Sequence, residues 1–257
     1  MDPLRGGVQL MGSAIVYGLI TGLSLLIGAI VGLLFNLSKR ATAMWMAFGS
    51  GVLICAITFG LMEEAFHLGG FTSALAGFGM GGLVFLLGDY MMHMSGAKRH
   101  KSKPLVKEAP PSTGLLISMG AILDGIPESV ALGVALFAGK STGLLMAAAI
   151  FLSNLPEGLS SVPGLQREGY SRRKILGIWL AASLLLVVIV IVSYLFLGEL
   201  HPMVLGFIQA FAAGAILAML ANSMMPEAYD EGGFAITPMT ILGFLAAFVI
   251  AKWESAI

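Results

Sequence analysis

Mostly apolar runs, separated by short polar stretches, follow one another along the whole chain. The runs lie at 8–35, 41–62, 70–92, 114–138, 142–164, 175–197, 203–225 and 236–253. Each is close to the roughly 20 apolar residues that a helix needs to cross the hydrocarbon core of a bilayer. Strands of a membrane barrel would be shorter and would alternate between apolar and polar residues. The pattern therefore predicts an all-α integral membrane protein with eight transmembrane helices.

The composition agrees with this class. Hydrophobic residues make up 58% of the chain and charged residues only 11%, and the mean hydropathy is +0.94. A water-soluble globule of this size would need more polar surface. No long polar segment separates the runs, so we expect one transmembrane domain over residues 1–257. The first run lacks the short apolar core and cleavage site of a signal peptide, and we expect it to be retained.

Positive charge is distributed unevenly over the ends of the runs. Eleven of the 14 Lys and Arg residues follow the first, third and fifth runs. Because Lys and Arg favour the cytoplasmic side of a membrane, this side should be cytoplasmic and both termini should lie outside. The stretch 95–113, with basic residues and paired prolines, is then a cytoplasmic loop. In a protein of the cell membrane, we expect its charges to set the topology and meet anionic lipid rather than nucleic acid.

Two similar segments occur far apart in the chain. FGSGVLICAITFGLMEEAF covers 48–66 and FAAGAILAMLANSMMPEAY covers 211–229, and they share Phe, Gly, Met, Glu and Ala in register. By the predicted topology, the first runs outward and the second inward, as in transporters with an inverted repeat, which bind their substrate near the midplane. We therefore expect spans 1–3 and 6–8 to form an inverted-repeat bundle around central spans 4 and 5. Chance similarity between apolar helices is the alternative.

Carboxylates lie well inside two of the apolar runs. Asp124 and Glu128 are four residues apart in the fourth run, and Asn154 and Glu157 are three apart in the fifth, so each pair shares a helix face. An ionised carboxylate at the bilayer centre costs about 2.5 to 3.5 kcal/mol on insertion scales. No Lys or Arg occurs at the same depth in any run. These acids must therefore be protonated, face water or hold a cation.

A proline accompanies each set of polar residues. Pro127 and Pro156 each remove a backbone N–H and displace the carbonyl four residues earlier, at Leu123 and Leu152. Freed carbonyls, carboxylates and the amide of Asn154 would form an all-oxygen site suited to a divalent cation. The alternative is a pair of kinked helices whose acids are protonated and hydrogen-bonded to each other.

These motifs resemble those of the ZIP (Zrt/Irt-like) metal transporters. The resemblance covers nearly the whole chain: eight spans, a cytoplasmic loop after span 3, and a Pro-Glu motif in each of spans 4 and 5. It implies that Glu128 and Glu157 are the principal metal ligands. Asp124 occupies the position of the family's span 4 histidine, Ser153 that of the span 5 histidine, and Asn154 follows it.

The chain departs from the family pattern around these cores. Both histidines are missing, Gly125 stands where the family has Asn, and Ser129 stands where it has Gly. The oxygen-only set Asp124, Glu128, Asn154 and Glu157, with Ser153 as a further ligand, favours harder ions such as Mn²⁺ or Fe²⁺. The resemblance alone favours zinc. A two-metal centre is not expected, because residues 175–197 contain no carboxylate.

We therefore expect transport of a divalent transition-metal cation toward the cytoplasm, with the metal as substrate rather than cofactor, and no enzyme activity. Further acids suggest the ends of its route. Those at the outer end are Glu63 and Glu64, with His67, and those at the inner end are Glu227, Asp230 and Glu231. Solvated charges at helix ends are an equally good interpretation.

Two functions from other classes stay open. A transport-inactive membrane sensor or scaffold would bind metal without moving it. An intramembrane metal-dependent enzyme would need a nucleophile or phosphate-binding cluster, and the sequence offers only serines without a basic partner at that depth. The expected partners are divalent metal ions and the lipid bilayer, without nucleic acid. The oligomeric state stays open, with a homodimer as one option.

Overall fold

The computed structural model describes residues 3–35, 37–94, 113–138, 140–197 and 200–253. The predicted loop 95–113 lies outside the described residues, apart from Thr113, which begins a helix. The elements are α1 (Pro3–Leu34), α2 (Lys39–Cys55), η1 (Ala56–Met62), α3 (Glu63–Met94), α4 (Thr113–Ala138), α5 (Lys140–Arg167), α6 (Arg172–Leu197), α7 (Pro202–Met219), η2 (Leu220–Met224), α8 (Met225–Gly232), η3 (Gly233–Ala235) and α9 (Ile236–Trp253).

The described part of the chain is helical and contains no strand, which confirms the all-α prediction. Within the described residues, six helical stretches are long and apolar enough to cross a membrane. They are Gly12–Leu34, Lys39–Met91, Ser118–Leu136, Thr142–Arg167, Arg172–Leu197 and Pro202–Lys252. The protein is therefore a multi-pass membrane protein by the length and apolar character of its helices.

Two of these stretches are far longer than a bilayer is thick. Lys39–Met91 has 53 residues and Pro202–Lys252 has 51. At 1.5 Å per residue, each would extend about 75 to 80 Å, more than twice the hydrocarbon core. A glycine interrupts the helical backbone in each: Gly70 has φ 72° and ψ 178°, and Gly233 has φ 60°. Residues other than glycine rarely adopt such positive φ angles.

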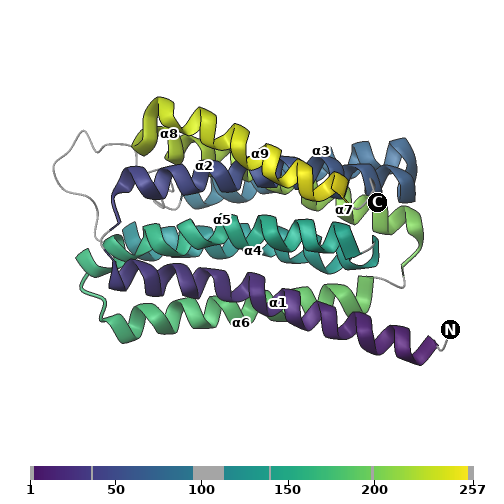
Figure 1. Cartoon of the computed structure of the whole chain (residues 1–257), viewed down its shortest axis with the longest axis horizontal. Coiled ribbons are helices and arrows are strands. Elements are labelled where there is room, and N and C mark those ends of the chain that lie inside the picture. Colours follow the sequence, from purple (N-terminus) through teal and green to yellow (C-terminus); the bar gives the residue numbers. More distant parts are fainter. Residues whose placement is uncertain (1–2, 36, 95–112, 139, 198–199, 254–257) are drawn as a thin grey trace.

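The central helices are α4 and α5, which pack on each other (Figure 1). On one side, α1 packs on α5 and α6 packs on α4, and α1 and α6 also contact each other. On the other side, α2 packs on α5 and α9, while α7 packs on α3 and α4. Side chains projecting from α4 toward α5 are therefore enclosed by helices from both sides.

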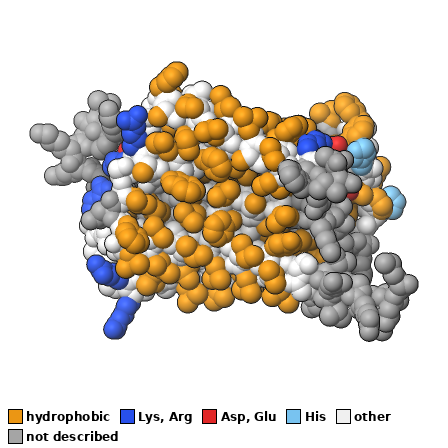
Figure 2. All heavy atoms as spheres, in the orientation of Figure 1, with side chains coloured by type: hydrophobic (Ala, Val, Ile, Leu, Met, Phe, Trp, Pro, Cys, Tyr) orange, Lys and Arg blue, Asp and Glu red, His pale blue; other side chains and the backbone are white. Residues whose placement is uncertain are grey.

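Lys and Arg side chains gather at one end of the molecule (Figure 2, left). At this end α2 begins at Lys39, α5 ends at Arg167 and α6 begins at Arg172. The first residues of α1 and the last of α9 lie at the opposite end (Figure 1). The uneven charge along the chain thus becomes a difference between the two ends of the bundle.

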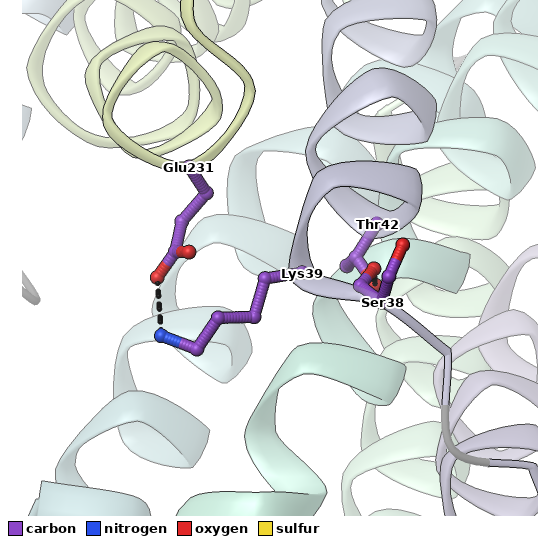
Figure 3. A network of polar contacts seen from close by, with 4 residues as sticks. All are labelled: Ser38, Lys39, Thr42 and Glu231. Carbon is purple, nitrogen blue, oxygen red and sulfur yellow. Dashed lines mark hydrogen bonds and ion pairs between the residues drawn. The ribbon is translucent and has the colours of Figure 1, made fainter.

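An ion pair joins α2 to α8 at the basic end. Lys39 Nζ lies 2.9 Å from Glu231 Oε1 (Figure 3). Ser38 starts α2 as its N-cap, because its hydroxyl accepts a hydrogen bond from the Ala41 N–H at 3.2 Å. Lys39 is largely exposed, so the pair is worth at most about 1 kcal/mol.

The segments 48–66 and 211–229 also share local structure. The π-helical turns of η1 lie within the first segment, and those of η2 lie at the matching place in the second. Each segment makes two close backbone contacts with a partner helix. In one, a glycine of the segment lies against a carbonyl of the partner, and in the other, a Phe carbonyl of the segment lies against a glycine of the partner. A Cβ on any of these glycines would overlap the opposing carbonyl. These contacts are Gly51 on Thr240 O and Gly243 on Phe48 O between α2 and α9, and Gly214 on Phe78 O and Gly81 on Phe211 O between α7 and α3.

Candidate metal centre

The two Pro-Glu motifs lie inside continuous helices. Pro127 is within α4 and Pro156 is within α5. Four of the five predicted site residues are buried, with exposed fractions of 4% for Asp124, 1% for Glu128, 0% for Ser153 and 1% for Asn154. Glu157 is half-buried. The structure thus places the predicted side chains within the protein rather than against lipid.

A hydrogen bond connects the two motifs. Ser153 Oγ on α5 lies 3.3 Å from Glu128 Oε1 on α4, and the same hydroxyl lies 3.1 Å from the Ile150 carbonyl. The carboxylate of Glu157 is near enough for its charge to act on Glu128. Residues 25 or more apart in sequence therefore meet at one place between the central helices.

Polar atoms at this meeting point lack partners. Within the described residues, Glu128 Oε2 and Asn154 Nδ2 are buried and accept or donate no hydrogen bond. Buried polar atoms are nearly always bonded to protein, water or an ion, because leaving them without a partner costs about 1 to 3 kcal/mol. A cation or a water would satisfy the carboxylate oxygen of Glu128, and an acceptor such as water would satisfy the amide N–H of Asn154.

The neighbouring helix α1 fixes the position of α5 beside the motif. Gly28 on α1 touches the Leu155 carbonyl, and Gly158 on α5 touches the Leu25 carbonyl, so closely that a Cβ at either glycine would overlap the opposing backbone. These contacts flank Pro156 and Glu157. The α5 backbone around Glu157 is therefore held in place by backbone-to-backbone contacts with α1.

The carbonyl that Pro156 was expected to free lies toward another helix. A Cβ at Gly49 of α2 would be 3.0 Å from Leu152 O. This oxygen therefore faces the α2 backbone.

No compact cage of acids is formed. In the described part of the chain, no three His, Cys, Asp or Glu side chains gather closely enough to hold a metal ion. The structure brings Glu128 together with Ser153 and within range of Glu157. Asp124 is buried on α4 like Glu128, and its role as a metal ligand stays a prediction.

The remaining predicted acids lie near the two ends of the bundle. Glu63 and His67 are exposed and Glu64 is half-buried on the first turns of α3. On α8, Asp230 is exposed and Glu227 is half-buried. Glu231 is half-buried and forms the ion pair with Lys39, so a cation leaving at this end would compete with a lysine for it.

An apolar cavity lies on the other side of α4. It has a volume of about 310 Å³ between α3, α4 and α7, and Pro127, Ala212 and Asp89 are among its lining residues. Asp89 also accepts a hydrogen bond from Asn222 in η2. Neither glutamate of the Pro-Glu motifs lines this cavity, so it is separate from the candidate centre.

The sequence matches no known family model and no curated protein.

Two polar features were missed in the sequence. One is the pairing of Asp89 with Asn222, which are 133 residues apart and which no local pattern connects. The other is Gln209, which is fully buried in α7 with an exposed fraction of 1%. A carboxamide inside the apolar run 203–225 is visible in the sequence and, like the carboxylates, is a signal of a polar site in a membrane.

Proposed function

We propose that this protein carries a divalent metal cation across the cell membrane toward the cytoplasm, in the manner of the ZIP transporters that its Pro-Glu motifs resemble. The observation that supports this most directly is the Ser153 to Glu128 hydrogen bond. It joins the two motifs between the central helices, where Glu128 Oε2 is buried and has no hydrogen-bond partner among the described residues.

The ligand set suggests how the cation is bound. Glu128 and Glu157 supply the negative charge. Asn154 and Ser153 supply neutral oxygen ligands after their side chains rotate. Two carboxylates with neutral oxygens and water suit Mn²⁺ or Fe²⁺ as well as Zn²⁺. The resemblance makes zinc the first ion to try. Rotation of Ser153 away from Glu128 would free Oε1 for the metal.

We propose eight membrane crossings, with spans 1–3 and 6–8 forming an inverted repeat around α4 and α5. The interruptions at Gly70 and Gly233 support this, because each divides an overlong stretch into two lengths near that of a bilayer. The matching η1 and η2 turns and the matching glycine contacts support the repeat. The basic end is then cytoplasmic and both termini lie outside.

The decisive experiment is uptake of Zn²⁺, Mn²⁺, Fe²⁺, Co²⁺ and Cd²⁺ by proteoliposomes. Wild-type protein should show saturable uptake of at least one ion. Glu128→Gln and Glu157→Gln should each lower uptake at least about tenfold, since each removes a charged ligand at a cost above 1.4 kcal/mol. Glu168→Gln, a matched change just beyond the end of α5, should leave uptake unchanged.

Other outcomes separate the alternatives. Metal binding that depends on Glu128 and Glu157, without uptake by correctly folded protein, would replace the transporter by a sensor or scaffold. Neither binding nor uptake of any of the five ions would reject the metal function entirely.

A further inference from the structure

Gln209 is a buried amide with nothing to bond. Its exposed fraction is 1%, and neither Oε1 nor Nε2 has a hydrogen-bond partner among the described residues. A carboxamide offers two acceptor sites and two donors, so the side chain leaves its full bonding capacity unused. In an apolar environment this is unfavourable unless something binds there.

The side chain faces the interior of the bundle. One turn further along α7, on the same face, Ala212 and Ala213 belong to a buried cluster that also contains Leu132 and Leu136 of α4 and Leu61 of η1. Gln209 therefore lies inside the bundle and does not face lipid.

Its depth places it between the outer end and the candidate centre. Gln209 lies seven residues into α7 from Pro202, about 10 Å along the helix axis. Glu128 lies ten residues before the end of α4 at Ala138, about 15 Å from the same end of the bundle. Counted from these helix ends, Gln209 lies about one helical turn nearer the outer end of α7 than Glu128 lies to that of α4.

Other buried side chains without partners do not offer the same chemistry. Trp179 Nε1 on α6 is also buried without a partner, but an indole N–H can only donate and cannot bind a cation. Ser183, one turn along the same helix, offers a single hydroxyl. Gln209 presents a carbonyl oxygen, a good ligand for hard divalent cations, on a side chain long enough to reorient.

We propose that Gln209 is a second binding site for the transported cation, on the outer side of the Glu128 and Glu157 centre. This inference rests on the proposed function. The amide oxygen binds a partly hydrated divalent ion, while the amide N–H group donates to one of its waters or to a nearby carbonyl. Because the ligand is neutral, the ion is held more weakly than at the two glutamates and moves on toward them.

The test uses Mn²⁺ as probe and a variant that lacks the inner centre. Mn²⁺ binding to purified Glu128→Gln, Glu157→Gln protein is measured by electron paramagnetic resonance. One weak site should remain. Adding Gln209→Leu should abolish it, and adding Gln209→Glu should tighten it at least about tenfold, since a carboxylate replaces a neutral oxygen. Ser183→Ala, which removes another buried partnerless group, should leave it unchanged.

Uptake kinetics give an independent measurement in protein with the native glutamates. Gln209→Leu should raise the KM for uptake at least about tenfold, and Gln209→Met, which keeps the length without the oxygen, should behave like it. Gel filtration checks that every variant elutes as a monodisperse, folded species. If Gln209→Leu aggregates, Gln209→Glu is measured instead, and its KM should change because it binds the cation more tightly.

The outcomes separate this site from the main proposal. If the Glu128→Gln, Glu157→Gln background binds no Mn²⁺, or if Gln209→Leu changes neither Mn²⁺ binding nor KM, Gln209 is a structural amide and the inference is wrong. If Mn²⁺ binding depends on Gln209 but wild-type protein takes up no ion, the site stands and the transport function fails.

Discussion

At the scale of single residues, the candidate centre depends on one small side chain, Ser153 of α5. Ser153 donates to Glu128 Oε1 and orients the carboxylate between α4 and α5. A hydroxyl in this place both positions the glutamate and offers a weak ligand oxygen. The ligand set that we propose thus consists of carboxylates, an amide and a hydroxyl, without the imidazole nitrogen that favours zinc.

Ser153→Ala tests this role. The substitution removes the hydroxyl oxygen that we propose as a neutral ligand, so we expect the KM for cation uptake to rise at least about tenfold, a loss of about 1.4 kcal/mol. Ser160→Ala, about two turns further along α5, is the matched control, because among the described residues that hydroxyl bonds to a backbone carbonyl, that of Glu157, and not to a carboxylate. Equal KM values for Ser153→Ala and wild type would show that Ser153 neither positions Glu128 nor binds the cation.

At the scale of helices, the position of Glu157 is set by how closely α1 approaches α5. The reciprocal contacts of Gly28 with Leu155 O and of Gly158 with Leu25 O leave no room for a methyl group. Small residues allow such approach in membranes, where close backbone packing stabilises helix pairs. The polar motif on α5 thus depends on apolar packing that contains no ligand.

Gly28→Ala should separate the two helices. The added methyl group overlaps a backbone carbonyl, which cannot move aside as a side chain can, so we expect a loss of about 1 to 3 kcal/mol in stability and a lower melting temperature. Gly12→Ala on the same helix is the control: nothing lies within 4 Å of a Cβ there, and alanine favours the helix. Equal melting temperatures for the two variants would contradict the close contact.

At the scale of the whole molecule, charge distinguishes one end of the bundle from the other. Basic residues begin α2 and α6 and end α5 at one end, while Glu63, Glu64 and His67 begin α3. This arrangement suits a path in which cations meet acids on the outer side and a basic surface fixes the orientation toward the cytoplasm.

Labelling with a membrane-impermeant maleimide tests this orientation and the eight crossings together. In a Cys55→Ser background, cysteine at His67 or His201 should react in intact cells. Cysteine at Ser171 or Asp230 should react only after permeabilisation. All four native side chains are exposed, so access depends on the side of the membrane alone. Reaction of the His67 and Ser171 positions from the same side would reject the proposed topology.

The sequence by itself determined the class of protein, because the apolar length and the helical spacing of residues are local properties. It also placed the carboxylates Asp124, Glu128 and Glu157 inside helices, where only burial or a ligand makes them tolerable. The helix ends agreed within a few residues except after the second and seventh runs. There the helix continues through the polar residues that were expected to end it, and a left-handed glycine, Gly70 or Gly233, interrupts it instead.

Only the tertiary structure decided which of these residues meet. It brought together residues far apart in the chain, Ser153 with Glu128 and Lys39 with Glu231. It also left the buried side chain of Gln209 without a hydrogen-bond partner among the described residues. Such contacts follow from how helices cross and how closely their glycines allow them to approach. Spacing within one helix fixes which side chains share a face, but it does not fix which helix that face meets.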